Sequence, residues 1–421
     1  GWSLERIDPA RSCGQSANWS ASVDPKGGTP GAVNSVFAAN IDHTRPEVVW
    51  GGALSVSTAG VDFSEPMDTG RLQNRFNYRL SDGWDVPATV EVTGENKVKL
   101  TWDRPFEINR SYTLEIENQA DACGNQLGTV PVTVQWITLV PGDVVINEVL
   151  FNPWPGGADF VEIYNRSDKR IDSRLLVLAS RDAEMKLKQP VSLSPAQAIV
   201  LPGSYLAVTI DTSAVFSFYT TFCRSGIRQL PALPSYPNER GQVVLLTDSL
   251  KVLDEFSYSE KMHHPLLYDV KGVSLERINP NTPAGQSGNW QSAASVAGYA
   301  TPGCLNSQFS NEPVRATRVT VEPAVISPDN DGYNDELNIR YETKTSGWVA
   351  NAWIFDASGR TICRLLKNEL MQTSGLISWK GEDETGKRLD AGIYVLLIEL
   401  FDMNGNIERH KKAVTLTVRY E

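Results

Sequence analysis

The sequence predicts an all-β protein built from several β-sandwich domains in tandem. The 421 residues are too many for one hydrophobic core and should form two to four domains. Eleven Trp, 32 Gly and 24 Pro residues favour short strands joined by turns over helices. Short segments in which apolar and polar residues alternate recur along the chain, which is typical of half-buried strands.

An internal repeat indicates how these domains are arranged. Residues 1–19 and 272–290 align without a gap and share the patterns S-L-E-R-I-x-P and G-Q-S-x-N-W. A Thr-Pro-Gly and an Asn-Ser follow at matching places after both copies, which indicates duplication. About 36 residues cannot form a sandwich alone. We therefore expect the first copy to be the C-terminal tail of a preceding domain, in a polypeptide that continues N-terminally. The predicted regions are 1–37, 38–140, 141–309 and 310–421.

Region 38–140 contains three clear strand patterns, VEVTG, KVKLTW and SYTLEIENQ, and a turn at DACGNQ. The element FSEPMD at 63–68, followed by Asn77-Tyr78 and later by YTL and Gly124-Asn125, resembles the bacterial immunoglobulin-like domain of S-layer proteins. This resemblance implies a spacer sandwich. The acidic residues of FSEPMD are then expected to serve turns and strand edges.

Region 141–309 pairs the motif VVINEVL, from residue 144, with DFVEIYN, from residue 159. Together with the closing G-x-S-L-E-R, these motifs resemble the lamin-tail domain. That resemblance implies an immunoglobulin-like sandwich of a type that recurs in secreted bacterial proteins beside nucleases, phosphatases and adhesion modules. The first copy of the repeat would then be the tail of another lamin-tail-type domain. A Pro-rich passage near 216–240 is expected to form a surface loop.

Region 310–421 opens with SPDNDGYND and continues with IFDASGR, SWKGEDETGKRLDAGIY and HKKAVTLTV. This order resembles two related groups, the immunoglobulin-like domain of flagellar hook-capping proteins and the C-terminal sorting domains of type IX secretion cargo. The resemblance implies a further immunoglobulin-like sandwich. It also implies that the type IX machinery exports the chain to the cell surface or the medium of a Gram-negative bacterium.

Composition excludes several classes of protein. The net charge of −11, without a long Lys/Arg run, disfavours nucleic-acid binding. No stretch approaches 18 apolar residues, so no transmembrane segment is predicted, and no signal peptide is visible. Five cysteines without C-x-x-C spacing exclude a zinc knuckle, and their odd number leaves at least one thiol unpaired. Cys123 and Cys223 lie in different predicted domains and should not pair with each other, whereas a partner of Cys13 outside the chain stays open.

The sequence contains no G-x-S-x-G, H-E-x-x-H or G-x-x-x-x-G-K-[ST] motif, so no catalytic or cofactor-binding residue is predicted and the protein is not expected to be an enzyme. Glu148 and Glu162 could form a carboxylate pair for acid–base chemistry. We expect them instead to hold strands and turns through bonds to backbone amides. His263 and His264 would point to opposite faces of a strand, so they are expected to be surface or half-buried residues rather than metal ligands.

Two candidate ligand sites remain. Asp329, Asp331 and Asp335 surround a glycine turn, an arrangement that suits calcium, although a turn built by Asx side chains explains the same residues. Trp154, in N-P-W-P-G-G, could bind a glycan or pack against the domain, whereas the matched Trp19 and Trp290 are expected to be core anchors. Asp248-Ser249-Leu250 resembles a short O-glycosylation site of exported bacterial proteins.

These features favour a non-enzymatic surface or secreted protein that acts as a structural, adhesive or binding module. Two alternatives stay open. The chain could be an accessory subunit of an outer-membrane uptake or secretion complex, with loops that bind a β-barrel partner or a surface glycan. It could also be the non-catalytic tail of a larger secreted hydrolase.

Overall fold

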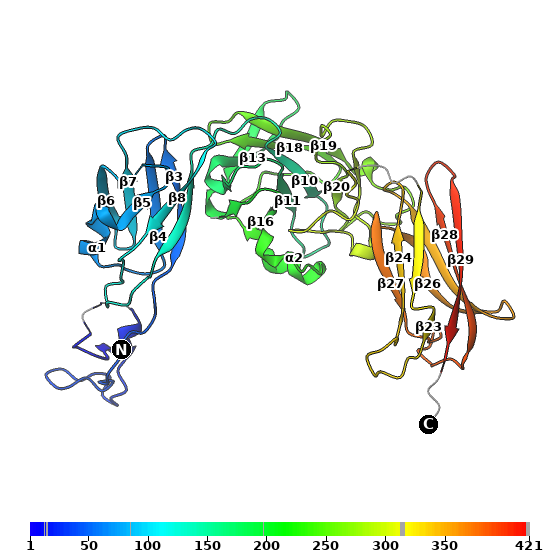
Figure 1. The fold of residues 1–421 in the computed structure, drawn as a ribbon, viewed down its shortest axis with the longest axis horizontal. Coiled ribbons are helices and arrows are strands. Elements are labelled where there is room, and N and C mark those ends of the chain that lie inside the picture. Colours follow the sequence, from blue (N-terminus) through cyan, green and yellow to red (C-terminus); the bar gives the residue numbers. More distant parts are fainter. Residues whose placement is uncertain (12, 14–15, 85, 197, 312–315, 418–421) are drawn as a thin grey trace. The chain divides into compact units, whose positions relative to one another are not determined.

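The computed structural model describes residues 1–11, 13, 16–84, 86–196, 198–311 and 316–417. They belong to two compact units, Gly1–Thr138 and Leu139–Glu421 (Figure 1). Strands dominate both units, which confirms the predicted all-β class of tandem immunoglobulin-like domains. Short 3-10 helices lie at Ser16–Asn18, Arg75–Asn77, Ser173–Leu175, Ser194–Ala196, Arg224–Gly226, Glu260–Met262 and Ser295–Ala297. Among the described helices, none is both long and apolar enough to cross a membrane.

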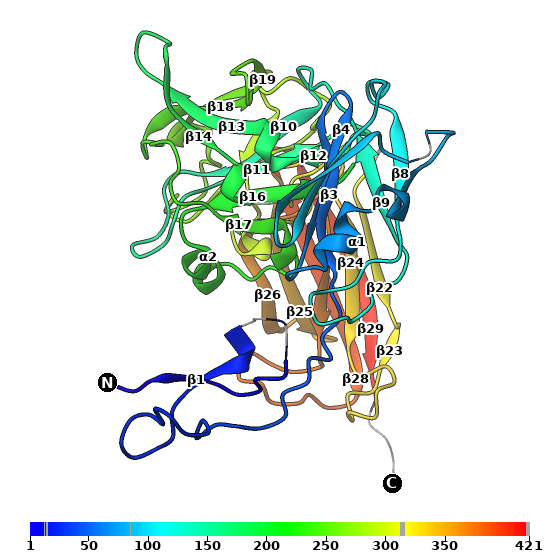
Figure 2. The same cartoon turned by 90° about the vertical axis from the view of Figure 1, so that its left-hand side faces the viewer.

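The first 37 residues form a small structure of their own, which we call the N-terminal segment. Its strands β1 (Leu4–Arg6) and β2 (Trp19–Ala21) make a two-stranded antiparallel sheet in which Leu4 pairs with Ala21. β1 lies next to the N-terminus, and a long loop lies beyond it (Figure 2). So short a sheet has little core, and it is held mainly by hydrogen bonds.

The remainder of the first unit is a sandwich of a four-stranded sheet, ordered β3-β4-β7-β6, and a three-stranded sheet, ordered β5-β8-β9. The strands are β3 (Val48–Ser55), β4 (Thr58–Phe63), β5 (Tyr78–Leu80), β6 (Thr89–Gly94), β7 (Lys97–Thr101), β8 (Ser111–Ile116) and β9 (Val130–Gln135). The strand patterns predicted here form β6, β7 and β8. Inward side chains of both sheets share one core, to which β8 contributes every second residue. Helix α1 (Thr69–Gln73) begins at the FSEPMD element, where Asp68 accepts a hydrogen bond from the Arg71 amide.

The second unit begins with what we call the central module, residues 139–311. It contains a six-stranded sheet, a four-stranded sheet and a small third sheet, ordered β17-β16-β11-β10-β20-β21, β14-β13-β18-β19 and β12-β15. The six-stranded sheet contains β10 (Val144–Leu150), β11 (Phe160–Asn165), β16 (Tyr205–Thr209), β17 (Ile227–Gln229), β20 (Leu275–Arg277) and β21 (Trp290–Ser292). The others contain β12 (Ile171–Asp172), β13 (Leu176–Arg181), β14 (Leu187–Ser192), β15 (Ile199–Val200), β18 (Arg240–Thr247) and β19 (Val252–Ser259). All seven residues of β10 are buried, so both of its faces are covered.

The passage near 216–240 is more than the surface loop expected from its prolines. Helix α2 (Thr212–Phe218) runs into it, capped by Asp211, whose side chain accepts from the amides of Ser213 and Ala214. β17 follows and pairs in parallel with β16. The expectation is therefore wrong for this part of the passage, because apolar residues between the prolines, such as Tyr236, are buried.

The chain ends in a second sandwich, the C-terminal module. A three-stranded sheet, ordered β22-β24-β27, accompanies a five-stranded sheet, ordered β23-β29-β28-β25-β26. The strands are β22 (Arg318–Glu322), β23 (Val325–Ile326), β24 (Leu337–Glu342), β25 (Val349–Asp356), β26 (Thr361–Leu370), β27 (Ser374–Trp379), β28 (Gly392–Phe401) and β29 (Ile407–Leu416). Side chains of both sheets form one core around the fully buried Trp348.

Hydrogen bonds join the central and C-terminal modules within the second unit. The Gln308 side chain donates to the Met371 carbonyl at 2.9 Å and accepts from the Gly347 amide at 3.1 Å. The Thr373 amide donates to the Ser307 carbonyl at 3.0 Å. Ser295 adds a bond from its hydroxyl to the Glu369 carboxylate at 2.6 Å. Gln308 is fully buried, so its side chain makes these bonds out of contact with water.

Candidate functional site

Three buried glutamates lie side by side in the six-stranded sheet of the central module. Glu148 of β10 pairs across strands with Glu162 of β11 on one side and with Glu276 of β20 on the other. All three have no exposed surface. Three carboxylates this close and this deep are costly to ionise together, so their hydrogen-bond partners decide what they can do.

The three carboxylates bind a single loop, residues 301–308. Glu148 accepts from the Thr301 amide at 2.9 Å, and Glu162 accepts from the Gly303 amide at 2.6 Å. Glu276 accepts from the Thr301 hydroxyl, the Ser307 hydroxyl and the Gln308 amide, each at 2.8 Å. Backbone amides in this loop therefore find their acceptors in the sheet. We call this arrangement the glutamate clamp.

Burial sets the protonation of the clamp. Burial, followed by the neighbouring charge of Glu276, raises the pKa of Glu148 to about 8, although bonds from Ser274 and Thr301 oppose the rise. Burial also raises the pKa of Glu162, with the charge of Glu148 as the next cause. Burial also raises the pKa of Glu276, although the hydrogen bonds that its carboxylate accepts oppose this rise. The cluster thus holds protons at neutral pH, which allows three carboxyl groups to share so small a volume.

The clamped loop has two further attachments. Asn306 donates to the carbonyls of Asn147, at 3.0 Å, and Arg277, at 2.8 Å. A disulfide joins Cys304 to Cys223, with 5.5 Å between the Cα atoms. Together with the glutamates, these bonds fix the loop against several strands of the six-stranded sheet.

Sequence reasoning found Glu148 and Glu162 and predicted their structural role, which the hydrogen bonds to backbone amides agree with. It missed Glu276 and its counterpart Glu5. Both occupy the same position in the repeated S-L-E-R pattern, and the repetition of that acidic residue was the available signal. Glu5 accepts from the Thr29 hydroxyl at 2.7 Å and from the Ser35 amide at 2.6 Å. The N-terminal segment therefore repeats part of the clamp.

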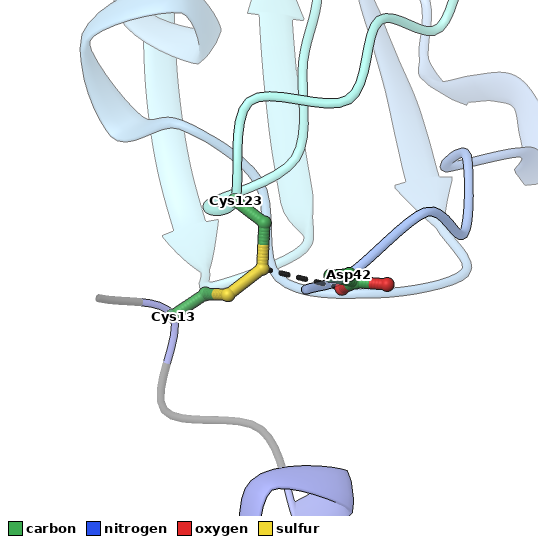
Figure 3. A group of neighbouring side chains, drawn as sticks. All are labelled: Cys13, Asp42 and Cys123. Carbon is green, nitrogen blue, oxygen red and sulfur yellow. Dashed lines mark hydrogen bonds between the residues drawn. A yellow bond between two sulfur atoms is a disulfide. The ribbon is translucent and has the colours of Figure 1, made fainter. Parts of the chain in front are cut away.

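A second disulfide links the N-terminal segment to the sandwich that follows it. Cys13 is bonded to Cys123, and Asp42 lies beside them, with its Oδ2 atom 3.2 Å from the Cys123 sulfur (Figure 3). Arg11 pairs with Asp42 at 2.9 Å. Because both sulfurs are oxidised and the carboxylate is paired, this group offers no thiolate to a metal ion. The partner of Cys13, left open by the sequence, lies within the chain.

Cys363 is the unpaired thiol that the odd cysteine count predicts. It is buried in the C-terminal module, and burial raises its pKa to about 11. A thiol held neutral and away from solvent does not react readily.

The acidic loop of the C-terminal module brings together the three predicted calcium ligands. One carboxylate oxygen from each of Asp329, Asp331 and Asp335 lies within 4.8 Å of the others. These carboxylates also accept amide bonds: Asp335 from Asn330 at 2.6 Å and from Gly332 at 2.8 Å, and Asp331 from Tyr333 at 2.8 Å. The geometry therefore fits both the calcium prediction and the turn built by Asx side chains.

Trp154 is 37% exposed, and its indole edge packs against the backbone of Gly272. Part of the ring is thus in contact with the domain, and its role as a glycan-binding residue stays a prediction. Trp290 is buried, as expected, but Trp19 is 46% exposed, so the expectation that both are core anchors is wrong for Trp19. Ser249 lies in the exposed turn between β18 and β19, where an O-glycosylation site would be accessible.

The two histidines are also placed differently from the expectation. His263 and His264 follow a 3-10 helix rather than lying in a strand, and both are almost fully buried. The His263 ring and the His264 amide share the Ser292 hydroxyl, at 3.0 and 2.8 Å. Burial lowers the pKa of His263 to about 4, so the ring is neutral at physiological pH. The surface or half-buried role expected for them is therefore wrong, because they pack into the central module.

Some solved structures resemble the chain weakly. The N-terminal part of the bacterial S-layer protein SbsC is 20% identical over 39% of this chain, at a TM-score of 0.22, and the match covers 40% of that structure. A longer SbsC fragment is 13% identical over 89% of this chain and 54% of its own length, with a TM-score of 0.22. Latent PorU from Porphyromonas gingivalis is 9% identical over 87% of this chain and 32% of its own length, with a TM-score of 0.20. Scores this low carry no conclusion about function.

Family models identify two regions more specifically. No curated protein matches the chain. Residues 40–137 match the bacterial Ig-like domain, in the first unit. Residues 320–416 match the CHU_C type IX secretion signal domain, in the C-terminal module. The chain is therefore a modular protein that carries an Ig-like domain and a type IX secretion signal domain.

Proposed function

We propose that this chain is a non-enzymatic surface or secreted protein, exported through type IX secretion, whose sandwiches serve as structural or adhesive modules. The observation that carries the proposal is the type IX secretion signal domain at residues 320–416. Such a signal addresses a protein to the outside of the cell, where tandem sandwiches act as spacers and binding modules.

The two disulfides support export. Cys13–Cys123 and Cys223–Cys304 close long stretches of chain, with sequence separations of 110 and 81 residues. Disulfides of this kind form and persist in oxidising compartments and are rare in the bacterial cytosol. Both bonds tie a loop to a sandwich, which suits a protein that must stay folded outside the cell.

The glutamate clamp supports a structural rather than a catalytic role for the central module. Its carboxylates have no exposed surface, and they accept bonds from the loop that they hold. A general acid or base must instead reach a substrate. Glu148, Glu162 and Glu276 also lie in the three motifs that carry the lamin-tail resemblance, so we assign the central module to that type of domain and the clamp to its framework.

Export can be tested on the full chain in a bacterium that has the type IX machinery. The full chain and a variant that ends at residue 315 should be compared by cell fractionation and by protease treatment of intact cells. We expect the full chain at the surface or in the medium, and the truncated form to be retained at least ten-fold more. A strain without the machinery should retain both. Equal export of the two forms would contradict the proposal.

The partner that we propose is a surface glycan or an outer-membrane β-barrel protein, with Trp154 as the contact to a glycan. Its indole presents an exposed part beside a proline-rich turn, and aromatic faces stack on sugars. Trp154→Ala should abolish binding of the full chain to an array of bacterial surface glycans, whereas Trp19→Ala, at another exposed tryptophan, should leave it unchanged. Stoichiometric recovery of a membrane barrel with the chain would favour the accessory-subunit alternative.

A further inference from the structure

We infer that one end of the central module docks on a lipid bilayer whose headgroups carry phosphate. Two loops, residues 218–228 and 303–305, form this end, which we call the docking tip. Phe222 and Leu305 would enter the outermost apolar layer of the bilayer, and the two arginines of the tip would bind the phosphates. The inference goes beyond the proposed function, because it assigns a lipid partner and does not depend on export through type IX secretion.

The docking tip is held firmly on the module. The Cys223–Cys304 disulfide joins its two loops. The Thr221 hydroxyl donates to the Pro302 carbonyl at 2.9 Å, and the Gly303 amide is bound by the glutamate clamp. Helix α2 leads into the tip at the margin of the central module, on the side away from β18 and β19 (Figures 1 and 2). Because the loops are fixed at several points, they have little conformational freedom left to lose when they bind a partner.

Large apolar side chains project from the tip on both sides of the disulfide. Phe222, which precedes Cys223, is 96% exposed, and Leu305, which follows Cys304, is 53% exposed. Phe218, at the end of α2, is 42% exposed. Single exposed apolar residues are common on proteins, but here a phenylalanine and a leucine flank one crosslink. Burial of these side chains in an apolar medium would be favourable.

The tip is cationic, although the chain as a whole has a net charge of −11. Residues 212–238 include two basic residues, Arg224 and Arg228, and no acidic one, and residues 278–311 contain no charged residue. Asp211, which precedes the first of these segments, caps the start of α2, at the other end of the helix from the tip. The glutamates of the clamp have no exposed surface, so they present no charge to a partner. The tip therefore attracts anions.

Both arginines can reach phosphate groups without breaking an ion pair. The Arg224 guanidinium lies over the Phe216 ring, 4.7 Å from its centroid. Arg228 donates to the carbonyls of Ser225 and Ile227, at 2.7 and 2.9 Å. These contacts involve a ring and neutral carbonyls, so they do not neutralise the positive charges. An arginine can bind phosphate through two parallel hydrogen bonds, while its long stem lies along an apolar layer.

These features fit a lipid surface better than a protein partner. Three apolar side chains offer only a small part of the roughly 1,200 Å² that a stable protein–protein interface buries. A bilayer instead deforms around a few apolar side chains, and each basic residue near anionic headgroups adds attraction. We therefore expect the docking tip to bind reversibly at millimolar lipid, and more tightly to anionic than to neutral bilayers.

The test uses the purified full chain, with both disulfides intact, and sedimentation with lipid vesicles. Vesicles of phosphatidylcholine alone should bind the chain about ten-fold more weakly than vesicles that also contain phosphatidylglycerol, and high salt should reduce that difference. The tip variant, Phe222→Ser with Leu305→Ser, should bind the charged vesicles about ten-fold more weakly than the unchanged chain. The control variant, Phe76→Ser with Ile108→Ser, changes two exposed apolar residues of the first unit and should bind like the unchanged chain.

A tryptophan placed in the tip would locate the contact. Phe222→Trp should lose fluorescence when the acyl chains of the vesicles are brominated, measured as the difference from the unchanged chain. Phe76→Trp, at another exposed ring, should show no such loss. All of these substitutions lie at exposed positions, so the variants should fold and melt like the unchanged chain.

Three results would overturn the inference. The first is no binding to charged vesicles at millimolar lipid. The second is equal binding by the tip variant and the control variant, which would place the lipid contact elsewhere. The third is equal binding to neutral and charged vesicles, which would remove the role of the arginines. Export is tested separately in cells, so none of these results would contradict the proposed function.

Discussion

Replacing Glu148 by glutamine should make the central module increasingly more stable than the unchanged module as the pH rises toward 8. Glutamine has the size of the protonated carboxyl group that the folded module contains. Its carbonyl oxygen can keep the bond from the Thr301 amide, now 2.9 Å from Glu148. Its amide can donate to the Thr301 hydroxyl, which lies 3.2 Å from Glu148 and itself donates to Glu276. The loop should therefore stay clamped.

The expected size follows from the raised pKa of Glu148, from its ordinary 4.5 to about 8. Between these two values the folded state binds more protons than the unfolded state, so the free energy of unfolding falls as pH rises from 4.5 to 8 and is level above that. The whole fall is roughly 5 kcal/mol. His263 has a pKa lowered by burial to about 4, and it acts in the opposite direction below its ordinary 6.5. Between pH 6.5 and 9 the ionisation of Glu148 therefore lowers the free energy of unfolding by about 2 kcal/mol.

Calorimetric unfolding of the full chain at pH 6.5 and 9, with both disulfides intact, would measure this effect. The stability advantage of Glu148→Gln should grow by about 2 kcal/mol across that interval. Glu184→Gln, at an exposed glutamate of the same module, should show no such growth. An advantage that does not change with pH, or a variant that is equally destabilised at both pH values, would refute the idea of a protonated clamp.

Three further predictions concern other parts of the chain. Replacing Cys223 and Cys304 by serine should lower the stability of the central module by roughly 3–5 kcal/mol in denaturant unfolding, because the bond closes a long loop; a loss below about 1 kcal/mol would contradict this. Calcium should bind the full chain in titration calorimetry with millimolar or tighter affinity. Asp331→Asn, which can still accept the Tyr333 amide, should weaken that binding at least ten-fold, and no heat from the unchanged chain would remove the calcium site. Trp348→Ala should cost the C-terminal module about 3–5 kcal/mol, measured by its melting transition, since the ring is fully buried; Trp2→Ala, at an exposed ring, is the control.

Much of the fold could be predicted because local patterns of apolar and polar residues indicate where the strands lie. The segment SYTLEI alternates, and β8 buries every second residue as that alternation requires. The fully buried β10 shows no such alternation, and it was the motif INEVL rather than periodicity that indicated its place. Helix α2 was missed because its sequence, TSAVFSF, is rich in β-branched and aromatic residues, and its Asp211 cap was the only helical signal.

The site was less predictable, because it depends on contacts between distant residues. Glu148 and Thr301 are far apart in sequence, as are Cys13 and Cys123, and no spacing rule links either pair. The exposed Trp19 shows that a sequence repeat does not by itself predict burial. Its match to Trp290 predicted a core residue, yet burial depends on the strands around it and not on the repeat itself.

The joint between the central and C-terminal modules has a mechanical consequence. Ser307 and Gln308 bind the C-terminal module through the Thr373 amide and the Met371 carbonyl, and the same two residues bind Glu276 in the six-stranded sheet. Cys304, three residues earlier, is tied to Cys223 by a covalent bond. Tension applied to the C-terminal module therefore passes through a few residues into the glutamate clamp and a disulfide. A protein anchored at one end would transmit shear from flowing medium through this connection without first unravelling the loop.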